Sequence, residues 1–403
     1  MRSPFAEIPA RGRWVLVGCL VCQMGLGCSY VFSPVLKGIV AELGWTRAGF
    51  SAGSGPLLLA MSLAFPLVGS LADRLGPRWV LSGSTLLLGC AFLLMSGMHS
   101  RWEFYLINAL LGVALAGLGD IVVGAVAARW VAESRGLALG FVYIGSNVGG
   151  AIVPLAAAAI MAAESWRLAL GSVGAGAVLL VLPFAALVVR DPPPGYRPAA
   201  AHASAGEARD LDLDEALRTR SFWLLALVLF TFYFYYVGVL NHLVPFLSDI
   251  GYPDAQAAAR LSFAVAVGIA AKLAIGRLAD RMSRKTATLL NFALLTGASW
   301  LLLAVETPGV LPVFLVAQGL ATAAENVLLP LMVAECFGVR HLARIYGVLM
   351  LTLLAGAAGP IFAGASFDRL GSYRFAFGTF AVLNLVALGA LTLVRDERRM
   401  RWT

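Results

Sequence analysis

The tetrapeptide Leu-Ala-Asp-Arg at residues 71–74 recurs as Leu-Ala-Asp-Arg at residues 278–281, an offset of 207 positions. The same offset relates Ser-Trp-Arg-Leu-Ala-Leu-Gly at 165–171 to Ser-Tyr-Arg-Phe-Ala-Phe-Gly at 372–378, and Gly44 to Gly251. One offset that links three separate places indicates a duplicated unit of about 200 residues. Membrane proteins with two like halves are often transporters, and their site lies where the halves meet.

The composition is that of a membrane protein. Hydrophobic residues make up 60% of the 403 residues and charged residues only 13%, and the mean hydropathy is +0.84. The apolar residues form runs of about 20, long enough to cross a bilayer as helices. They do not alternate with polar residues, as the strands of a membrane barrel would. We therefore expect helices.

The runs predict an all-α membrane protein with twelve transmembrane helices in two six-helix, pseudo-symmetric bundles. We place the helices at 14–36, 49–72, 79–98, 103–127, 136–160, 166–189, 222–247, 257–279, 286–305, 309–334, 344–366 and 374–394. The polar, proline-rich stretch between the copies predicts a solvent loop with a short surface helix at 211–219. The expected domains are an N-terminal bundle at 1–189, a cytoplasmic linker at 190–221 and a C-terminal bundle at 222–403.

The basic residues predict the orientation. Of the 30 Lys and Arg residues, 22 fall on the side that holds both termini and the linker, and 7 fall on the other side. Positive loops stay in the cytoplasm, so both termini are expected there. The net charge of +8 lies in short loops and does not indicate a nucleic-acid partner. We expect a multi-pass protein of a bacterial inner membrane that functions as a monomer.

The repeated loop suggests a latch between neighbouring helices. Its acidic and basic side chains can cap helix ends and pair across an interface. A charge cluster that only sets the topology is the alternative. The candidate gating residues are Asp73, Arg74, Arg78, Arg135, Asp280 and Arg281.

With this loop in both halves and twelve expected spans, the chain resembles the major facilitator superfamily. Further stretches resemble the monocarboxylate transporter family and its oxalate/formate relatives. They are Gly-Cys-Ser-Tyr-Val-Phe-Ser-Pro at 27–34, Arg-Gly-Leu-Ala-Leu-Gly at 135–140, Gly-Ser-Asn-Val-Gly at 145–149, Ala-Arg-Ile-Tyr-Gly at 343–347 and Gly-Pro at 359–360. The resemblance implies a secondary transporter that works by alternating access.

Three formal charges lie well inside the apolar runs: Asp120, Lys272 and Glu325. An ionised group at mid-membrane costs at least about 2.5 kcal/mol, so all three call for an explanation. Counted from the predicted outer ends of their spans, they lie 15 to 17 residues in, at nearly one depth. The superfamily's architecture implies that Asp120 and Glu325 face each other from opposite halves, with Lys272 nearby.

Lys272 matches the position of a helix-8 arginine in the monocarboxylate transporters, which implies an anchor for an anionic substrate. Its other possible role is to neutralise Asp120 or Glu325. The family's acidic residue one turn earlier is Gly268 here, and its helix-1 lysine is Pro34. Asp120 and Glu325 are therefore the candidate proton carriers, because a carboxyl group in a dry cavity takes up a proton more readily when an anion approaches.

Uncharged polar side chains of the same spans are candidates for orienting the substrate. The substrate-binding candidates beside Lys272 are Tyr30, Tyr143, Asn147, Tyr236, Asn241 and Asn326. Gln23 and Tyr233 share the expected cavity. We interpret Lys37 as an interface residue whose ammonium group reaches toward the headgroups, and His242 as a gate, an interface residue or a proton relay.

These features predict proton-coupled symport of small monocarboxylates such as lactate or pyruvate. An oxalate/formate-type exchanger is the nearest alternative, although two carboxylates favour two cations and the 344–366 span offers none inside it. A drug exporter of the same fold is the third. An enzyme is not expected, since the chain has no P-loop, nucleophile elbow or HExxH motif. No cofactor is expected beyond the coupling proton.

Overall fold

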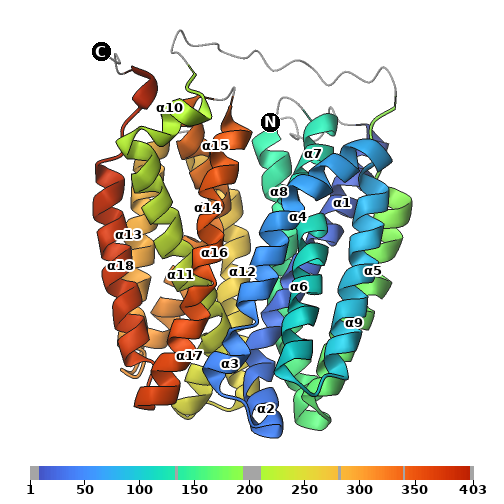
Figure 1. Cartoon of the computed structure of the whole chain (residues 1–403), viewed down its shortest axis with the longest axis vertical. Helices are drawn as coiled ribbons and strands as arrows, with labels where there is room; N and C mark the ends of the chain where they lie inside the picture. The colour runs from blue at the N-terminus through green and yellow to red at the C-terminus, as the bar shows by residue number, and fades with distance from the viewer. Residues whose placement is uncertain (1–8, 132–134, 194–209, 280–282, 339–340, 400–403) are drawn as a thin grey trace. The chain divides into compact units, whose positions relative to one another are not determined.

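The computed structural model describes residues 9–131, 135–193, 210–279, 283–338 and 341–399, without the side chains of a few residues inside helices. Every regular element in these ranges is a helix. The helices of each part of the chain run side by side along the vertical direction of Figure 1. The predicted all-α fold class is confirmed.

The first half of the chain supplies the elements up to residue 188. They are α1 (Ala10–Met24), η1 (Gly25–Val31), α2 (Phe32–Leu43), α3 (Arg47–Ser51), α4 (Ser54–Leu75), α5 (Pro77–Ser96), α6 (Arg101–Leu118), α7 (Asp120–Trp130), α8 (Arg135–Ala163), α9 (Trp166–Pro183) and the π-helical turn η2 (Phe184–Val188).

The second half begins with a short helix where the sequence predicts one. Its elements are α10 (Leu213–Leu217), α11 (Arg220–Asp249), α12 (Asp254–Ala279), α13 (Arg284–Leu303), α14 (Val310–Phe337), α15 (Leu342–Leu349), α16 (Thr352–Gly356), α17 (Ala358–Leu370), α18 (Arg374–Thr392) and η3 (Glu397–Arg399). A capping box between Asp212 and Glu215 starts α10, because the two side chains satisfy the free N–H groups of so short a helix.

Each predicted span corresponds to a helix or a run of helices. Among the described residues, ten helices are long and apolar enough to cross a membrane. α12 and α14 correspond to the other two predicted spans.

Several predicted spans are not the single helices that the apolar runs suggest. The first contains a 3-10 stretch at Gly25–Val31. The fourth is broken at Gly119, whose backbone is extended between α6 and α7. The eleventh is divided into α15, α16 and α17. Inside a bilayer, such breaks are tolerated where protein surrounds the backbone.

The repeat is visible in how helices approach one another. Gly149 of α8 and Gly356 of α16 occupy equivalent positions, 207 apart. A Cβ at Gly149 would lie 2.3 Å from the Met24 carbonyl oxygen of α1, and one at Gly356 would lie 2.5 Å from the Tyr233 Cβ of α11. Both copies therefore need glycine at the helix crossing, as small-residue packing in membranes requires.

The chain forms two compact units whose limits lie inside helices. Unit 1 comprises Met1–His202 and Leu243–Ile269, and unit 2 comprises Ala203–His242 and Ala270–Thr403. The end of α11 and the beginning of α12 thus belong with the N-terminal helices. The Val244 N–H donates to Ser33 Oγ (3.3 Å), and Asn147 Nδ2 donates to the Val265 carbonyl oxygen (3.0 Å).

Candidate functional site

Asp120 lies at the break in the fourth span. Gly119 ends α6, and Asp120 stands in the first turn of α7, where the helix dipole favours a negative charge. Gln23 of α1 donates from Nε2 to Asp120 Oδ1 at 3.0 Å. The Tyr143 hydroxyl of α8 donates to the Asp120 backbone carbonyl at 3.3 Å. The fold therefore brings the predicted residues Asp120 and Tyr143 together.

Gln23 is fully buried, and its Oε1 atom has no hydrogen-bond partner. An unpaired buried acceptor costs about 1–3 kcal/mol. A protonated Asp120 could donate a hydrogen bond to this acceptor after rotation of the amide. The pair is thus suited to both protonation states of the carboxyl group.

Two other predicted substrate-binding residues of unit 1 have structural contacts. Asn147 is buried and donates to α12 through the Val265 carbonyl. Tyr30 lies in η1, where its ring faces Gly150 of α8 closely enough to meet an added Cβ at 3.0 Å. Both residues pack at helix contacts, and Asn147 donates one of its two amide hydrogens to Val265.

Unit 2 holds the other two charges. Lys272 of α12 is 4% exposed and Glu325 of α14 is 1% exposed. The Tyr233 hydroxyl of α11 donates to Glu325 Oε1 at 3.3 Å. Tyr233, which the sequence placed in the expected cavity, therefore lies beside the predicted proton carrier Glu325.

The remaining substrate-binding candidates of unit 2 contact residues of their own helix or lie outside the described side chains. Asn241 donates to the Val237 carbonyl of its own helix at 3.0 Å, and the Tyr236 ring stacks on Phe232 with centroids 5.5 Å apart. The Asn326 side chain lies outside the described residues. Tyr236 and Asn241 thus have intrahelical contacts here.

His242 is a structural link within unit 2. It is fully buried. Its Nε2 is 2.9 Å from the Pro360 carbonyl oxygen and its Nδ1 is 3.1 Å from the Tyr373 hydroxyl. A carbonyl can only accept, so Nε2 carries a proton, and Nδ1 lies within hydrogen-bond distance of the Tyr373 hydroxyl. The ring joins α11 to α17 and to the turn before α18.

Only part of the predicted latch can be located. Arg74 is exposed in the last turn of α4, and the Arg78 guanidinium lies over the Trp79 ring, 5.1 Å from its centroid. The side chains of Asp73 and Arg135, and residues Asp280 and Arg281, lie outside the described residues. The pairing of these charges stays a prediction.

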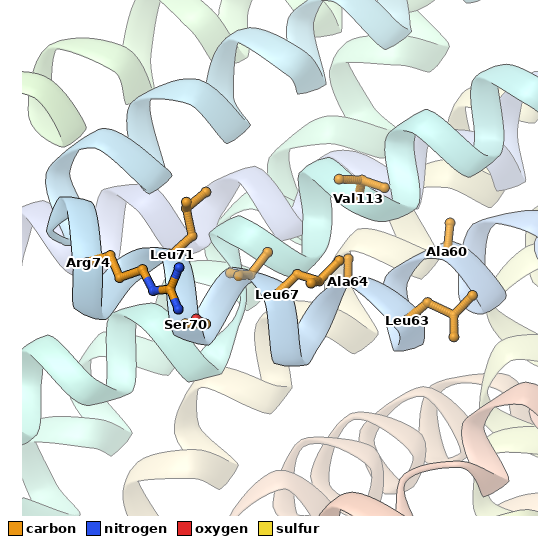
Figure 2. Close-up of a pocket in the computed structure, with 9 residues that line it drawn as sticks. Ala60, Leu63, Ala64, Leu67, Ser70, Leu71, Arg74 and Val113 are labelled. Atoms are coloured by element: carbon orange, nitrogen blue, oxygen red, sulfur yellow. The ribbon is translucent and has the colours of Figure 1, made fainter.

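A hollow of about 590 Å³ runs along one face of α4 and does not coincide with the buried charges. Figure 2 shows Leu63, Leu67 and Leu71 along it, with Ser70 and Arg74 at one end. Its lining is almost wholly apolar. Apart from Ser70 and Arg74, its lining offers no polar side chain that could orient a carboxylate.

The sequence interpretation missed an ion cluster in unit 1. Lys37 of α2 does not simply reach toward the headgroups: its Nζ lies 2.7 Å from Asp249 Oδ1. Arg47 of α3 donates two hydrogen bonds to the same carboxylate, from Nη1 to Oδ2 at 2.6 Å and from Nη2 to Oδ1 at 3.1 Å. The partners are more than 200 residues apart, so no local pattern could have paired them.

The chain matches known proteins over nearly its whole length. The profile described as Major Facilitator Superfamily matches residues 15–308 and 262–403. The uncharacterized MFS-type transporter YhjX of Escherichia coli (strain K12) is 24% identical over 351 residues, 85% of each chain. The multidrug resistance protein MdtG of Escherichia fergusonii is 31% identical over 149 residues, 36% of each chain.

Solved structures show the same fold. A bacterial homologue of the human lysosomal transporter Spinster, in an inward-facing and unoccupied conformation, matches with a TM-score of 0.75 at 18% identity. The match covers 98% of this chain and 99% of that chain. At this identity the likeness concerns the fold alone.

Proposed function

We propose, from the premise that this chain belongs to the major facilitator superfamily, that it moves small monocarboxylates together with a proton. Membership makes it a secondary transporter of a membrane and not an enzyme. Lactate and pyruvate represent the substrate class. Under this proposal, the chain shares with the monocarboxylate branch of the superfamily both its substrate class and the sequence motifs that it resembles.

The observation that carries this proposal is the burial of one cation and one carboxyl group in unit 2. Lys272 and Glu325 are at most 4% exposed within apolar helices. Buried charges in membrane spans are costly and mark substrate or ion pathways. Lys272 would bind the carboxylate as a point charge, and the hydrogen-bonded carboxyl groups of Glu325 and Asp120 would carry the proton.

The coupling between substrate and proton follows from the negative charge of the substrate. An anion at Lys272 favours the protonated form of a neighbouring carboxyl group, and that proton in turn favours the anion. The two ligands thus stabilise each other, and their mutual stabilisation is reciprocal. In this account Gln23 and Tyr233 position the two proton carriers, and Tyr143 holds the helix break.

The proposal includes the arrangement in the membrane. The repeat supports an N-terminal bundle at 1–189, a linker at 190–221 and a C-terminal bundle at 222–403. The excess of Lys and Arg in alternate loops supports cytoplasmic termini. Both bundles would contribute to one pathway in a monomer.

A screen of small acids by thermal shift of the purified protein tests the substrate class. Lactate and pyruvate should raise the unfolding temperature, because a ligand that binds only the folded state stabilises it. Lys272→Ala should lose the shift. Arg260→Gln is a matched control, since Arg260 lies on the same helix and its guanidinium stacks on Tyr252.

An equal shift with Lys272→Ala would remove the anchor role from Lys272. A shift with oxalate and formate but not with lactate would favour the exchanger. That alternative lacks a second cation among the described side chains of the predicted span 344–366, where the Arg344 side chain is not described.

Drug export is a second candidate because of the match to MdtG. It would use the apolar hollow of α4 rather than Lys272. Stabilisation by lipophilic cations, with no response to small acids, would favour this function.

A further inference from the structure

Four helices of unit 2 meet through buried polar side chains. Asn384 of α18 donates from Nδ2 to Ser299 Oγ of α13 at 2.6 Å, and Thr296 of α13 donates to the Asn384 backbone carbonyl at 3.3 Å. The Tyr235 hydroxyl of α11 donates to Gln318 Oε1 of α14 and lies close to the Ser299 side chain. We call these five buried residues the polar junction. None of them carries a formal charge, and the proposed transport mechanism uses none of them.

The polar junction contains an unpaired acceptor. Ser299 donates its hydroxyl hydrogen to the Leu295 carbonyl at 2.8 Å, so its oxygen can only accept from the Asn384 amide. This fixes Nδ2 as the amide atom that faces Ser299. The other atom, Asn384 Oδ1, is buried without a hydrogen-bond partner among the described residues. Such an acceptor costs about 1–3 kcal/mol, so a donor at this point would stabilise unit 2.

The first half has an apolar contact at the equivalent place. By the offset of 207, Ser299 corresponds to Phe92 of α5, and Asn384 corresponds to Ala177 of α9. Phe92 and Ala177 are both buried. The same helix crossing is therefore built once with apolar and once with polar residues, and the fold alone does not require the polar ones.

The exchange also makes room at the crossing in unit 2. A Cβ at Gly89 of α5 would lie 2.3 Å from Val178 Cγ2 of α9, so the first half is closely packed there. Thr296 stands at the position equivalent to Gly89, and α18 must leave it space that α9 does not leave. Ser299 in turn fills far less volume than the ring of Phe92. The polar junction thus combines polar groups with space, which are the two conditions for a buried water.

We propose that a buried water molecule binds at the polar junction and donates a hydrogen bond to Asn384 Oδ1. Its second hydrogen can go to the Tyr235 hydroxyl oxygen, because the hydrogen of that hydroxyl is committed to Gln318. Buried waters make about three hydrogen bonds to groups that would otherwise be unpaired. A cation fits less well, since the five side chains include no carboxylate to neutralise it.

The water completes the polar junction and thereby fixes the position of α11. A polar network holds its helices in one arrangement when it is fully satisfied, and destabilises them when it is only partly satisfied. Tyr235 and Tyr233 lie two residues apart on α11, and Tyr233 is the donor to Glu325. The hydrated junction therefore holds the helix that presents Tyr233 to Glu325.

Radiolytic labelling of the purified, full-length protein tests the water site. An X-ray pulse makes hydroxyl radicals from water, and radicals formed from a bound water oxidise the side chains beside it. The reporters are Tyr235 and Phe380, which are fully buried and whose ring centroids lie 6.0 Å apart. Phe380 precedes Asn384 by one turn of α18. Mass spectrometry should find both rings oxidised, whereas the equally buried Phe92 of the apolar crossing should stay unlabelled.

Two variants remove the water from opposite sides. Asn384→Leu keeps the branched shape of the side chain and removes the acceptor, so the labels on Tyr235 and Phe380 should fall to the level of Phe92. Ser299→Val makes the facing side chain of α13 apolar and should have the same effect. An unlabelled Phe92 shows that a variant is folded, and if one of the two variants does not fold, the other decides.

Asn108→Leu is the matched control. Asn108 is a buried asparagine of unit 1, and its Nδ2 donates to the carbonyl of its own helix at Phe104. The labels on Tyr235 and Phe380 should stay at the parent level in this variant.

The water site is overturned if Tyr235 and Phe380 of the parent protein are as unreactive as Phe92. It is also overturned if both rings stay labelled in a folded Asn384→Leu or Ser299→Val variant. The measurement needs neither a substrate nor a proton gradient, so its failure would leave the proposed monocarboxylate transport untouched.

Discussion

At the scale of single residues, the structure shows which side chains contact the buried carboxyl groups that the sequence identified. Asp120 and Glu325 were recognisable because a charge inside an apolar run has a cost. Their partners Gln23 and Tyr233 were not distinguishable from other polar residues of the same helices, because a helix offers several faces and the sequence does not say which faces meet. The roles of these residues stay predictions.

Replacement of Gln23 by Leu should destabilise the protein by about 1 kcal/mol, because the half-buried Asp120 carboxylate loses a donor while removal of the unpaired Gln23 Oε1 offsets part of the loss. Thermal unfolding in detergent measures this loss. Gln256→Leu provides the control, since Gln256 is exposed on α12. Equal stability of Gln23→Leu and Gln256→Leu would show that the Gln23 amide does not support Asp120.

At the scale of helices, hydropathy located the predicted spans but not their interruptions. The break at Gly119 and the 3-10 stretch at Gly25–Val31 leave the apolar pattern unchanged. Hydrogen-bond register, which hydropathy does not record, decides where such breaks fall. The break matters because it puts Asp120 at a helix start.

Glycine substitutions test the helix crossings. Gly149→Ala should lower stability by about 1–3 kcal/mol, because the added Cβ would overlap the Met24 carbonyl oxygen at 2.3 Å. Gly176→Ala is the matched control, since a Cβ there meets nothing within 4 Å. That change should leave the protein as stable or more stable, because alanine favours helix over glycine.

The unfolding temperatures of the two variants measure this difference in stability. Equal unfolding temperatures for Gly149→Ala and Gly176→Ala would contradict the close contact between α1 and α8.

At the scale of the whole molecule, the repeat predicted the family and the matched profile bears it out. The duplicated parts are the loop motif, the helix crossings and the turns after Glu42 and Asp249. The buried charges are not duplicated: by the offset, Lys272 corresponds to Phe65, and Glu325 corresponds to Leu118. The repeat therefore predicts the helical framework and says nothing about the substrate.

The central claim is coupled movement of a monocarboxylate and a proton, and uptake of labelled lactate into proteoliposomes tests it most directly. An inward proton gradient should drive accumulation above equilibrium, and a protonophore should abolish that accumulation. Asp120→Asn and Glu325→Gln, measured in parallel, should leave at most equilibrating exchange. Lactate uptake of equal extent with and without the proton gradient would contradict the account.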